Sequence, residues 1–267
     1  MSEEVPSTGT VDRVAFLLKV LAESEGEASV AQIVEKMSLP TSTTHRLLGL
    51  LVKTGLAARG VRPGTYCVGL EFLRLSGLVV SRTEVTAVAE PFMQQVTSAT
   101  GETCILNLFI PGQHKAMIAK VLYGHHPLRI EQELYKTSSL LYGALNRAIL
   151  AFLPSSTIDD VLLQQDPSPV TGKPLSDIRA VHRDLALIRD RGYAFSKGQR
   201  TSGAVGLGSP VFGGAGAVIA SLCITMPESR FVATRERKLV LALVEQATRL
   251  SAALGFDPNS RLEHLPL

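Results

Sequence analysis

Apolar residues in the first seventy positions recur at the three- and four-residue spacing of amphipathic helices. Ser29 and Gln32 fit a capping box at the start of the second helix, and Gly55 is placed to end the third. The tripeptide SLP separates these two helices by a short turn. The three inward stripes are Val14, Leu17, Leu18 and Leu21; Val30, Ile33, Val34 and Met37; and Thr44, Leu47, Leu48 and Leu51.

Two short strands follow the helices, at 56–59 and 65–69, and the sequence GVRPG joins them. Three helices with a tight turn between the last two, followed by a hairpin, are typical of a winged helix-turn-helix. Residues 71–82 then have the pattern of a connecting helix.

Beyond residue 83 the two-residue period of strands alternates with the helical period. Strands spaced as hairpins and flanked by helices predict an α+β domain built on an antiparallel sheet. The expected helices are 84–100, 140–153, 156–165, 176–191 (capped by Ser176) and 231–254, and the expected strands are 104–110, 115–122, 127–134, 193–198, 204–211 and 218–225.

These patterns divide the chain into a disordered leader (1–9), a winged-helix domain (10–70), a linker helix (71–82), a sheet domain (83–256) and a tail (257–267). A chain of 267 residues with 45% hydrophobic residues can bury the cores of two ordinary domains.

Composition places the chain in the cytoplasm. Its polar, acidic start lacks a signal-peptide pattern, and no apolar run reaches the roughly 18 residues that span a membrane. Cys67, Cys104 and Cys223 are far apart, which suits a reducing compartment better than a disulfide framework.

The net charge is only +3, but the charges are segregated. Between positions 41 and 66 there are four basic residues and no acidic one, whereas the acidic residues of this domain lie in and around the first two helices. Such a stretch is expected where a protein meets a phosphate backbone. The candidate DNA contacts are Thr41, Ser42, Thr43, His45, Arg46, Lys53, Arg59 and Arg62, with Arg62 placed to enter a minor groove. The competing interpretation is a solvated helix face that Thr41 or Ser42 merely caps.

Several segments, taken in order, resemble the IclR family of bacterial transcriptional regulators over about residues 10–255. They are "ASVAQIVEKMSLPTSTTHRLLGLLVKTGLAARG", "LYGALNRAILAFLP", "IRDRGYAFSKGQRTSGAVGLGSPVF" and "ASLCITMPESRF". The resemblance implies an N-terminal winged helix-turn-helix and a C-terminal GAF-like effector domain. It also implies a dimer, or a tetramer built from dimers, that binds a palindromic operator and controls catabolism of small organic or aromatic acids.

The sequence departs from the family's pattern at several positions. Thr41 stands where a lysine is common, and Thr44 stands where an aliphatic residue is usual, so its hydroxyl needs a backbone partner. Residues 141–143 replace a common His-Ala-small sequence, and Asn146 replaces a common glycine. Many family pockets have an acid where Ser196 stands.

The strand at 217–225 carries an apolar face and a second face that includes Ser221, Cys223 and Thr225. Small residues also share a face at Gly206 and Gly208. From the pattern alone, this second face is either a pocket floor or exposed to solvent. The resemblance favours the pocket, with the segment around 141–145 as the opposite wall. The candidate effector contacts are Leu128, Leu141, Tyr142, Gly143, Ala144, Leu145, Ser196, Gly206, Cys223 and Thr225.

The expected effector is a small carboxylic acid, with an aromatic acid among the candidates. Free N–H groups at the start of the helix, near Ser138 or Ser139, attract a carboxylate at residues 143–145. Tyr142 could stack on a ring or hydrogen-bond to it. Arg129 could supply a positive charge, although a structural salt bridge is the competing interpretation.

The sequence gives no reason to expect a cofactor, a metal site or catalysis. Adjacent histidines at 125–126 are expected in a loop, and on a strand they would point to opposite faces and chelate a metal poorly. GGAG at 213–216 is a hairpin turn that no helix follows. Three alternatives remain: a redox-responsive regulator acting through Cys223, a small-acid enzyme with an accessory winged-helix domain, and a winged helix that binds protein rather than DNA. The basic stretch disfavours the last.

Overall fold

The computed structural model of the chain describes residues 9–24, 26–75, 84–175 and 177–257. These residues form two compact units, one before and one after the boundary between positions 83 and 84. Residues 70–75 are helical. The rest of the predicted linker helix, nearly all of the predicted leader and tail, and Ser176 lie outside the described residues. The prediction that Ser176 caps the following helix is wrong, because Asp177 is the N-cap and its carboxylate accepts from the N–H of Ala180.

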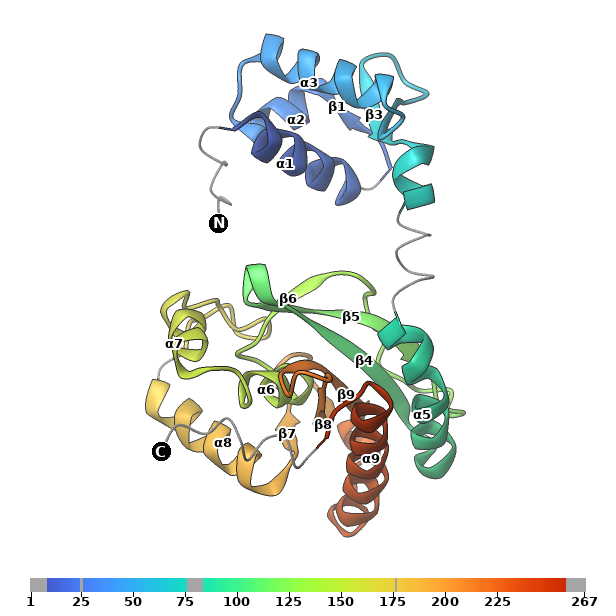
Figure 1. The fold of residues 1–267 in the computed structure, drawn as a ribbon, viewed down its shortest axis with the longest axis vertical. Coiled ribbons are helices and arrows are strands. Elements are labelled where there is room, and N and C mark those ends of the chain that lie inside the picture. The colour runs from blue at the N-terminus through green and yellow to red at the C-terminus, as the bar shows by residue number, and fades with distance from the viewer. Residues whose placement is uncertain (1–8, 25, 76–83, 176, 258–267) are drawn as a thin grey trace. The chain divides into compact units, whose positions relative to one another are not determined.

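The N-terminal unit is a winged helix-turn-helix, as the apolar periodicity predicts (Figure 1). Its small antiparallel sheet has the strand order β1-β3-β2. The two-residue strand β1, which the periodicity did not predict, pairs with β3, the second strand of the hairpin, so that β3 is the central strand of this sheet. The elements are α1 (Thr10–Ala22), β1 (Ala28–Ser29), α2 (Val30–Met37), α3 (Thr41–Lys53), β2 (Ala57–Arg59) and β3 (Thr65–Val68).

The predicted stripes of the three helices meet in one core that excludes water. Leu17, Ile33 and Leu47 are each 0% exposed. Thr44 is buried among them, and its hydroxyl donates to the carbonyl of Pro40 at 3.3 Å, which satisfies the polar group. The capping box of Ser29 and Gln32 is confirmed. This core fixes which side of α3 faces solvent.

The C-terminal unit is built on a six-stranded sheet in which every neighbouring pair is antiparallel, with the order β6-β5-β4-β9-β8-β7. Together with the winged helix, it confirms the α+β class. The glycine-rich segment 213–216 is the turn between β8 and β9. The strands are β4 (Thr103–Ile110), β5 (Lys115–Leu122), β6 (Thr137–Ser139), β7 (Ala194–Lys197), β8 (Ala204–Phe212) and β9 (Val218–Pro227).

Helices cover both faces of this sheet (Figure 1). Helices α5 (Glu84–Thr100) and α9 (Ala233–Ala253) pack on one face, against Leu222 and its neighbours. The opposite face carries α6 (Ala144–Leu150), α7 (Ser155–Leu163) and α8 (Ile178–Arg191). Short 3-10 helices η1 (Pro111–Gln113) and η2 (Glu228–Arg230) complete the unit.

Three predictions for this unit are wrong. Residues 127–134 form a loop rather than a strand, because the short strand β6 occupies the edge position beside β5. The helix predicted at 140–153 spans only α6, since Gly143 has φ of +85° and ψ of 151°, a conformation outside the helical region. The solvent-exposed interpretation of the polar face of β9 is also wrong, because Ser221, Cys223 and Thr225 are buried.

Candidate functional site

The first candidate site is the exposed side of α3. Thr41, Ser42, His45 and Arg46 are exposed on it, and Thr43 is half-buried. Pro40 is the N-cap and offers no side-chain hydrogen bond, so neither Thr41 nor Ser42 caps the helix. That part of the competing interpretation is wrong, and the two hydroxyls at the helix start are not engaged as caps.

Further basic side chains are exposed at the end of α3 and on the hairpin that follows it. Lys53 ends α3, Arg59 lies on β2, and Arg62 lies in the loop between β2 and β3; all three are exposed. Within the described residues, Arg46, Lys53 and Arg59 have no carboxylate within ion-pair distance. These three cations have no ion pair in the described part of the chain, and together with the exposed hydroxyls and imidazole of α3 they suit a polyanionic surface.

An acid that the sequence pattern does not place there folds against the wing, the hairpin of β2 and β3. The carboxylate of Glu27 accepts hydrogen bonds from the N–H of Val61 at 2.6 Å and from the hydroxyl of Thr65 at 2.7 Å. These bonds, that of Val61 first, lower the pKa of Glu27 to about 2. Arg62 Nε lies 3.5 Å from the same carboxylate. The wing is therefore not free of acids in space, and the charge of Arg62 is partly compensated.

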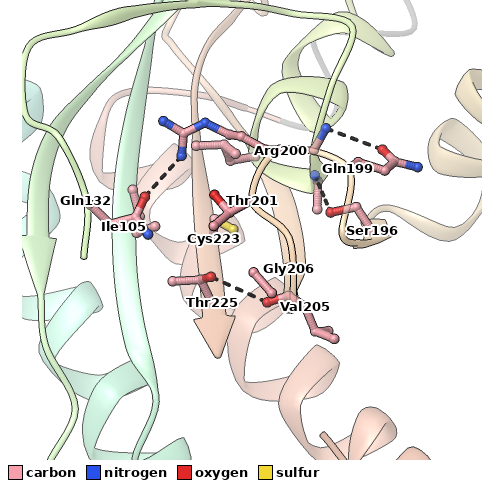
Figure 2. A pocket seen from close by; sticks show the side chains of 14 residues that line it. Ile105, Gln132, Ser196, Gln199, Arg200, Thr201, Val205, Gly206, Cys223 and Thr225 are labelled. Atoms are coloured by element: carbon pink, nitrogen blue, oxygen red, sulfur yellow. Dashed lines mark hydrogen bonds between the residues drawn. The ribbon is translucent and has the colours of Figure 1, made fainter. Parts of the chain in front are cut away.

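The second candidate site is a small cavity between the start of α6 and the sheet (Figure 2), with a volume of about 30 Å³. A cavity of that size holds no more than a few water molecules. Seven of the predicted effector contacts line it: Gly143, Ala144, Leu145, Ser196, Gly206, Cys223 and Thr225. We call this space the inner cavity.

The other three predicted contacts do not line the inner cavity. Leu128 is 64% exposed, and Leu141 is buried in the core shared with α7 and α8. Tyr142 lines a neighbouring cavity instead, and its hydroxyl donates to the carbonyl of Asp166 at 2.8 Å. That hydroxyl hydrogen is thus already engaged by the protein.

Small residues on β8 allow α6 to lie close to the sheet. A Cβ atom at Gly208 would lie 2.4 Å from the carbonyl oxygen of Ala144, which is closer than real atoms approach. Ser221 Oγ donates to the carbonyl of Leu145 at 2.6 Å, and Ser196 Oγ accepts from the N–H of Ala144 at 2.9 Å. The small polar face of the sheet therefore anchors the helix as well as forming the cavity floor.

Side chains of the protein already occupy part of the carboxylate site expected at the start of α6. The N–H of Ala144 is bonded to Ser196, and the N–H of Gly143 donates to Gln199 Oε1 at 3.3 Å. Two of the amides expected to receive a ligand thus already have side-chain acceptors (Figure 2). Arg129 is not the charge partner either, because it pairs with Glu131 at 2.8 Å and lies over the ring of Tyr123; the salt-bridge interpretation is confirmed.

Among the described residues that line the inner cavity, the charged one is Arg200, which the sequence pattern does not indicate. Its guanidinium donates to Gln132 Oε1 at 3.0 Å (Figure 2), and no carboxylate of the described residues lies within ion-pair distance. Burial lowers its pKa. Arg200 follows β7 in the irregular segment GQRTSG, where no periodicity indicates the direction of a side chain.

A larger, more open cavity of about 360 Å³ adjoins the inner one, and we call it the outer cavity. Gln132, Arg200 and Thr201 line both. Its volume falls within the usual size of small-molecule sites. The remaining wall includes the side chains of Thr137, Ser138, Ser139 and Asn146.

Two further predictions concern cysteine and metals. Cys223 is 1% exposed, and burial raises its pKa to about 12, so the thiol is protonated at neutral pH and poorly reactive.

No group of His, Cys, Asp and Glu side chains in the described part of the chain could hold a metal ion. Among the described residues, no helix has both the length and the apolar character needed to cross a membrane.

A winged helix-turn-helix followed in one chain by a sheet domain with a lined cavity defines a DNA-binding regulator with an effector domain. Residues 10–60 match the IclR helix-turn-helix domain, and residues 77–252 match the bacterial transcriptional regulator IclR C-terminal domain. The chain belongs to the IclR family.

Relatives with this domain order are similar along most of their length. The chain is 26% identical to the HTH-type transcriptional repressor AllR of Escherichia coli K12, over 93% of this chain and 91% of the repressor. It is 24% identical to the HTH-type transcriptional regulator KipR of Bacillus subtilis, over 85% of this chain and 90% of that one.

Solved structures show the same fold. An IclR transcriptional regulator from Alicyclobacillus acidocaldarius matches with a TM-score of 0.78 and 24% identity, over 94% of this chain and 99% of that chain. An IclR homologue from Microbacterium hydrocarbonoxydans, in complex with 4-hydroxybenzoate, matches with a TM-score of 0.76 and 23% identity, over 92% and 99%.

Proposed function

We propose that this protein is a cytoplasmic transcriptional regulator whose operator affinity changes when a small organic acid binds its C-terminal domain. It acts on a catabolic operon as a homodimer or a dimer of dimers and turns over no substrate. The single observation that carries the proposal is the exposed face of α3, where Arg46 lies near exposed hydroxyls and has no ion pair with any residue that the structure describes. The whole-length similarity to transcriptional repressors supports it.

Helix α3 enters the major groove of double-stranded DNA. Ser42, Thr43, His45 and Arg46 face base edges and phosphates, and Lys53 and Arg59 contact the phosphate backbone. Arg62 reaches the minor groove from the wing. Two-fold symmetry of a dimer sets two half-sites about one helical turn, or a multiple of it, apart.

The effector site comprises the inner and outer cavities. An IclR homologue holds 4-hydroxybenzoate, which supports a small organic acid as the class of ligand. Binding changes operator affinity only if the acid prefers one arrangement of the DNA-binding units over another. The redox alternative has no support from Cys223, since its pKa is raised by burial. No histidine is among the described residues that line either cavity, so the enzyme alternative gains no support from a histidine general base there.

The test is an Arg46→Ala substitution in the full chain. The wild-type operator is first obtained by selecting genomic fragments that the purified protein retains. Fluorescence anisotropy then compares the two proteins on that operator and on a scrambled duplex. We expect Arg46→Ala to lose specific retention by at least about tenfold, as loss of one bidentate base contact predicts.

Arg249→Ala is the matched control, because Arg249 is an exposed arginine on α9, in the other unit. It should bind the operator as the wild type does. Equal operator affinities of the wild type and Arg46→Ala, with unchanged circular dichroism, would contradict the assignment of α3 as the recognition helix.

A further inference from the structure

The inference concerns the charge balance of the two cavities, and it rests on the proposed effector function. Among the residues lining the inner cavity, Arg200 is the one that carries a charge. In the outer cavity, Glu131 pairs with Arg129 at 2.8 Å and Glu133 pairs with Lys136 at 2.6 Å. Each acid there has a closer cation, so Arg200 has no ion pair among the described residues and only a longer-range attraction to Glu133.

The present partner of Arg200 is a weak substitute for an anion. It is the neutral amide oxygen of Gln132, at 3.0 Å, while the amide nitrogen of Gln132 donates to the carbonyl of Ile130. A guanidinium can form a bidentate, charge-assisted pair of hydrogen bonds with a carboxylate, which is stronger than its single hydrogen bond with an amide oxygen. A ligand carboxylate can therefore replace Gln132 with a net gain in interaction. Arg200 lines both cavities, so such a ligand would extend from it into either one.

The residues that line the two cavities indicate which functional groups the ligand has besides its carboxylate. The inner cavity, at about 30 Å³, has no room for an aromatic ring as it stands. The outer cavity has about 360 Å³, and hydroxyl groups of Thr137, Ser138, Ser139 and Thr201 line it. Neither Thr137 nor Thr201 has a side-chain hydrogen bond with another described residue. Hydroxyls with free bonding capacity favour a ligand that is itself rich in hydroxyls.

We infer that Arg200 is the specificity-determining residue of the effector site and that the effector is a hydroxylated aliphatic acid. Its carboxylate displaces Gln132 from Arg200, and its hydroxyl groups lie among the hydroxyl side chains of the outer cavity. This differs from the aromatic acid that the sequence suggested, because most of the residues that line the outer cavity are polar or charged rather than apolar.

The experiment uses the full chain without DNA and measures binding by calorimetry. The probes are glycerate and gluconate, the neutral polyols glycerol and glucitol, the unsubstituted acid hexanoate, and 4-hydroxybenzoate. We expect a hydroxylated acid to bind at least about tenfold more tightly than the polyol of the same length and than hexanoate or 4-hydroxybenzoate. Equal binding of acid and polyol, tighter binding of 4-hydroxybenzoate or hexanoate, or no binding of either hydroxylated acid would each overturn the inference.

Two substitutions separate a recognition role from a structural one. Arg200→Gln should weaken binding of the acid at least about tenfold while leaving polyol binding unchanged. Gln132→Ala removes the competitor for Arg200 and should bind the acid at least as tightly as the wild type. The exposed Arg249→Gln is the control and should match the wild type. Weakening by Gln132→Ala and Arg200→Gln alike would indicate that the pair is structural and would defeat the inference.

Operator binding is measured separately by anisotropy, so the two proposals can fail independently. If the hydroxylated acid binds as expected but leaves operator affinity unchanged, the proposed regulatory coupling fails and the assignment of Arg200 stands. If 4-hydroxybenzoate binds more tightly than the hydroxylated acids and shifts operator affinity, the regulator stands and the assignment of the ligand class fails.

Discussion

Glu27 and Val61 are 34 residues apart in the sequence, yet the carboxylate of Glu27 accepts a 2.6 Å hydrogen bond from the backbone N–H of Val61. The same carboxylate accepts from the hydroxyl of Thr65 at 2.7 Å. An acid from the start of the small sheet thus holds the tip of the wing in place. It does so beside the arginine proposed to enter the minor groove.

Glu27→Gln should loosen the wing in a way that depends on pH. The pKa of Glu27 falls from 4.5 to about 2 on folding, so the ionised carboxylate stabilises the wing fully above about pH 4.5. This contribution disappears as the pH falls from about 4.5 to about 2. Urea unfolding of wild type and Glu27→Gln should therefore differ at pH 7, and the difference should shrink below pH 4.5. Glu35→Gln, an exposed substitution on α2, is the control; a difference that did not change with pH would contradict the role of Glu27.

Lys53 and Arg59 should contribute to DNA affinity through counterion release. Neither has an ion-pair partner in the described chain, so each is available to neutralise one phosphate. Replacing either by alanine should lower the slope of log affinity against log salt by about 0.9. It should weaken binding to operator and scrambled DNA alike. Anisotropy titrations between low and moderate salt measure the slope, and an unchanged slope in both variants would remove them from the interface.

The cysteines should differ in reactivity. Cys223 is buried with its pKa raised to about 12, and burial also raises the pKa of Cys104, whereas Cys67 is half-buried. At pH 8 a thiol-modifying reagent should label Cys67 in the folded chain and leave Cys104 and Cys223 unlabelled until urea is added. Peptide mapping by mass spectrometry reads the positions. Rapid labelling of Cys223 in the folded chain would revive the redox alternative.

The winged-helix unit was predictable because its signal is periodic. The stripe of Thr44, Leu47, Leu48 and Leu51 is the set that α3 buries, so its exposed face followed from the spacing alone. The position of Glu27 did not follow, since its contact with the wing depends on how β1 pairs with β3. A local count of charges along the sequence cannot include an acid that reaches the site through tertiary structure.

The effector site was harder to predict for a related reason. Gly206, Cys223 and Thr225 lie on regular strands, where alternation fixes the side of the sheet that they face. Arg200 and Gln132 lie in loops, and a loop has no period from which a direction can be taken. The strand wrongly predicted at 127–134 shows the same limit. Its polar and apolar residues alternate as in a strand, but the segment is a loop in which Arg129 and Glu131 pair with each other.

A last prediction concerns the buried ion pair that holds this loop. The carboxylate of Glu102 is 0% exposed, and Arg230 Nε lies 2.9 Å from both of its oxygens. Arg230 also donates to the carbonyl of Leu128 at 2.8 Å, which ties the loop at 127–134 to β4 through η2. Arg230→Met removes the closest cation of this buried carboxylate and leaves His126 Nε2, 3.9 Å away, as a basic neighbour, so we expect the C-terminal unit to lose about 3 kcal/mol of unfolding free energy.

Urea unfolding of the full chain, followed by a probe in the C-terminal unit, measures the loss. The double variant Arg230→Met with Glu102→Leu should recover much of it, because it removes the stranded charge along with its partner. Arg249→Met replaces an exposed arginine whose nearest carboxylate is 3.9 Å away, and it should change little. If Arg230→Met and Arg249→Met were equally stable, Arg230 would not be what holds Glu102, and the loop would need another anchor.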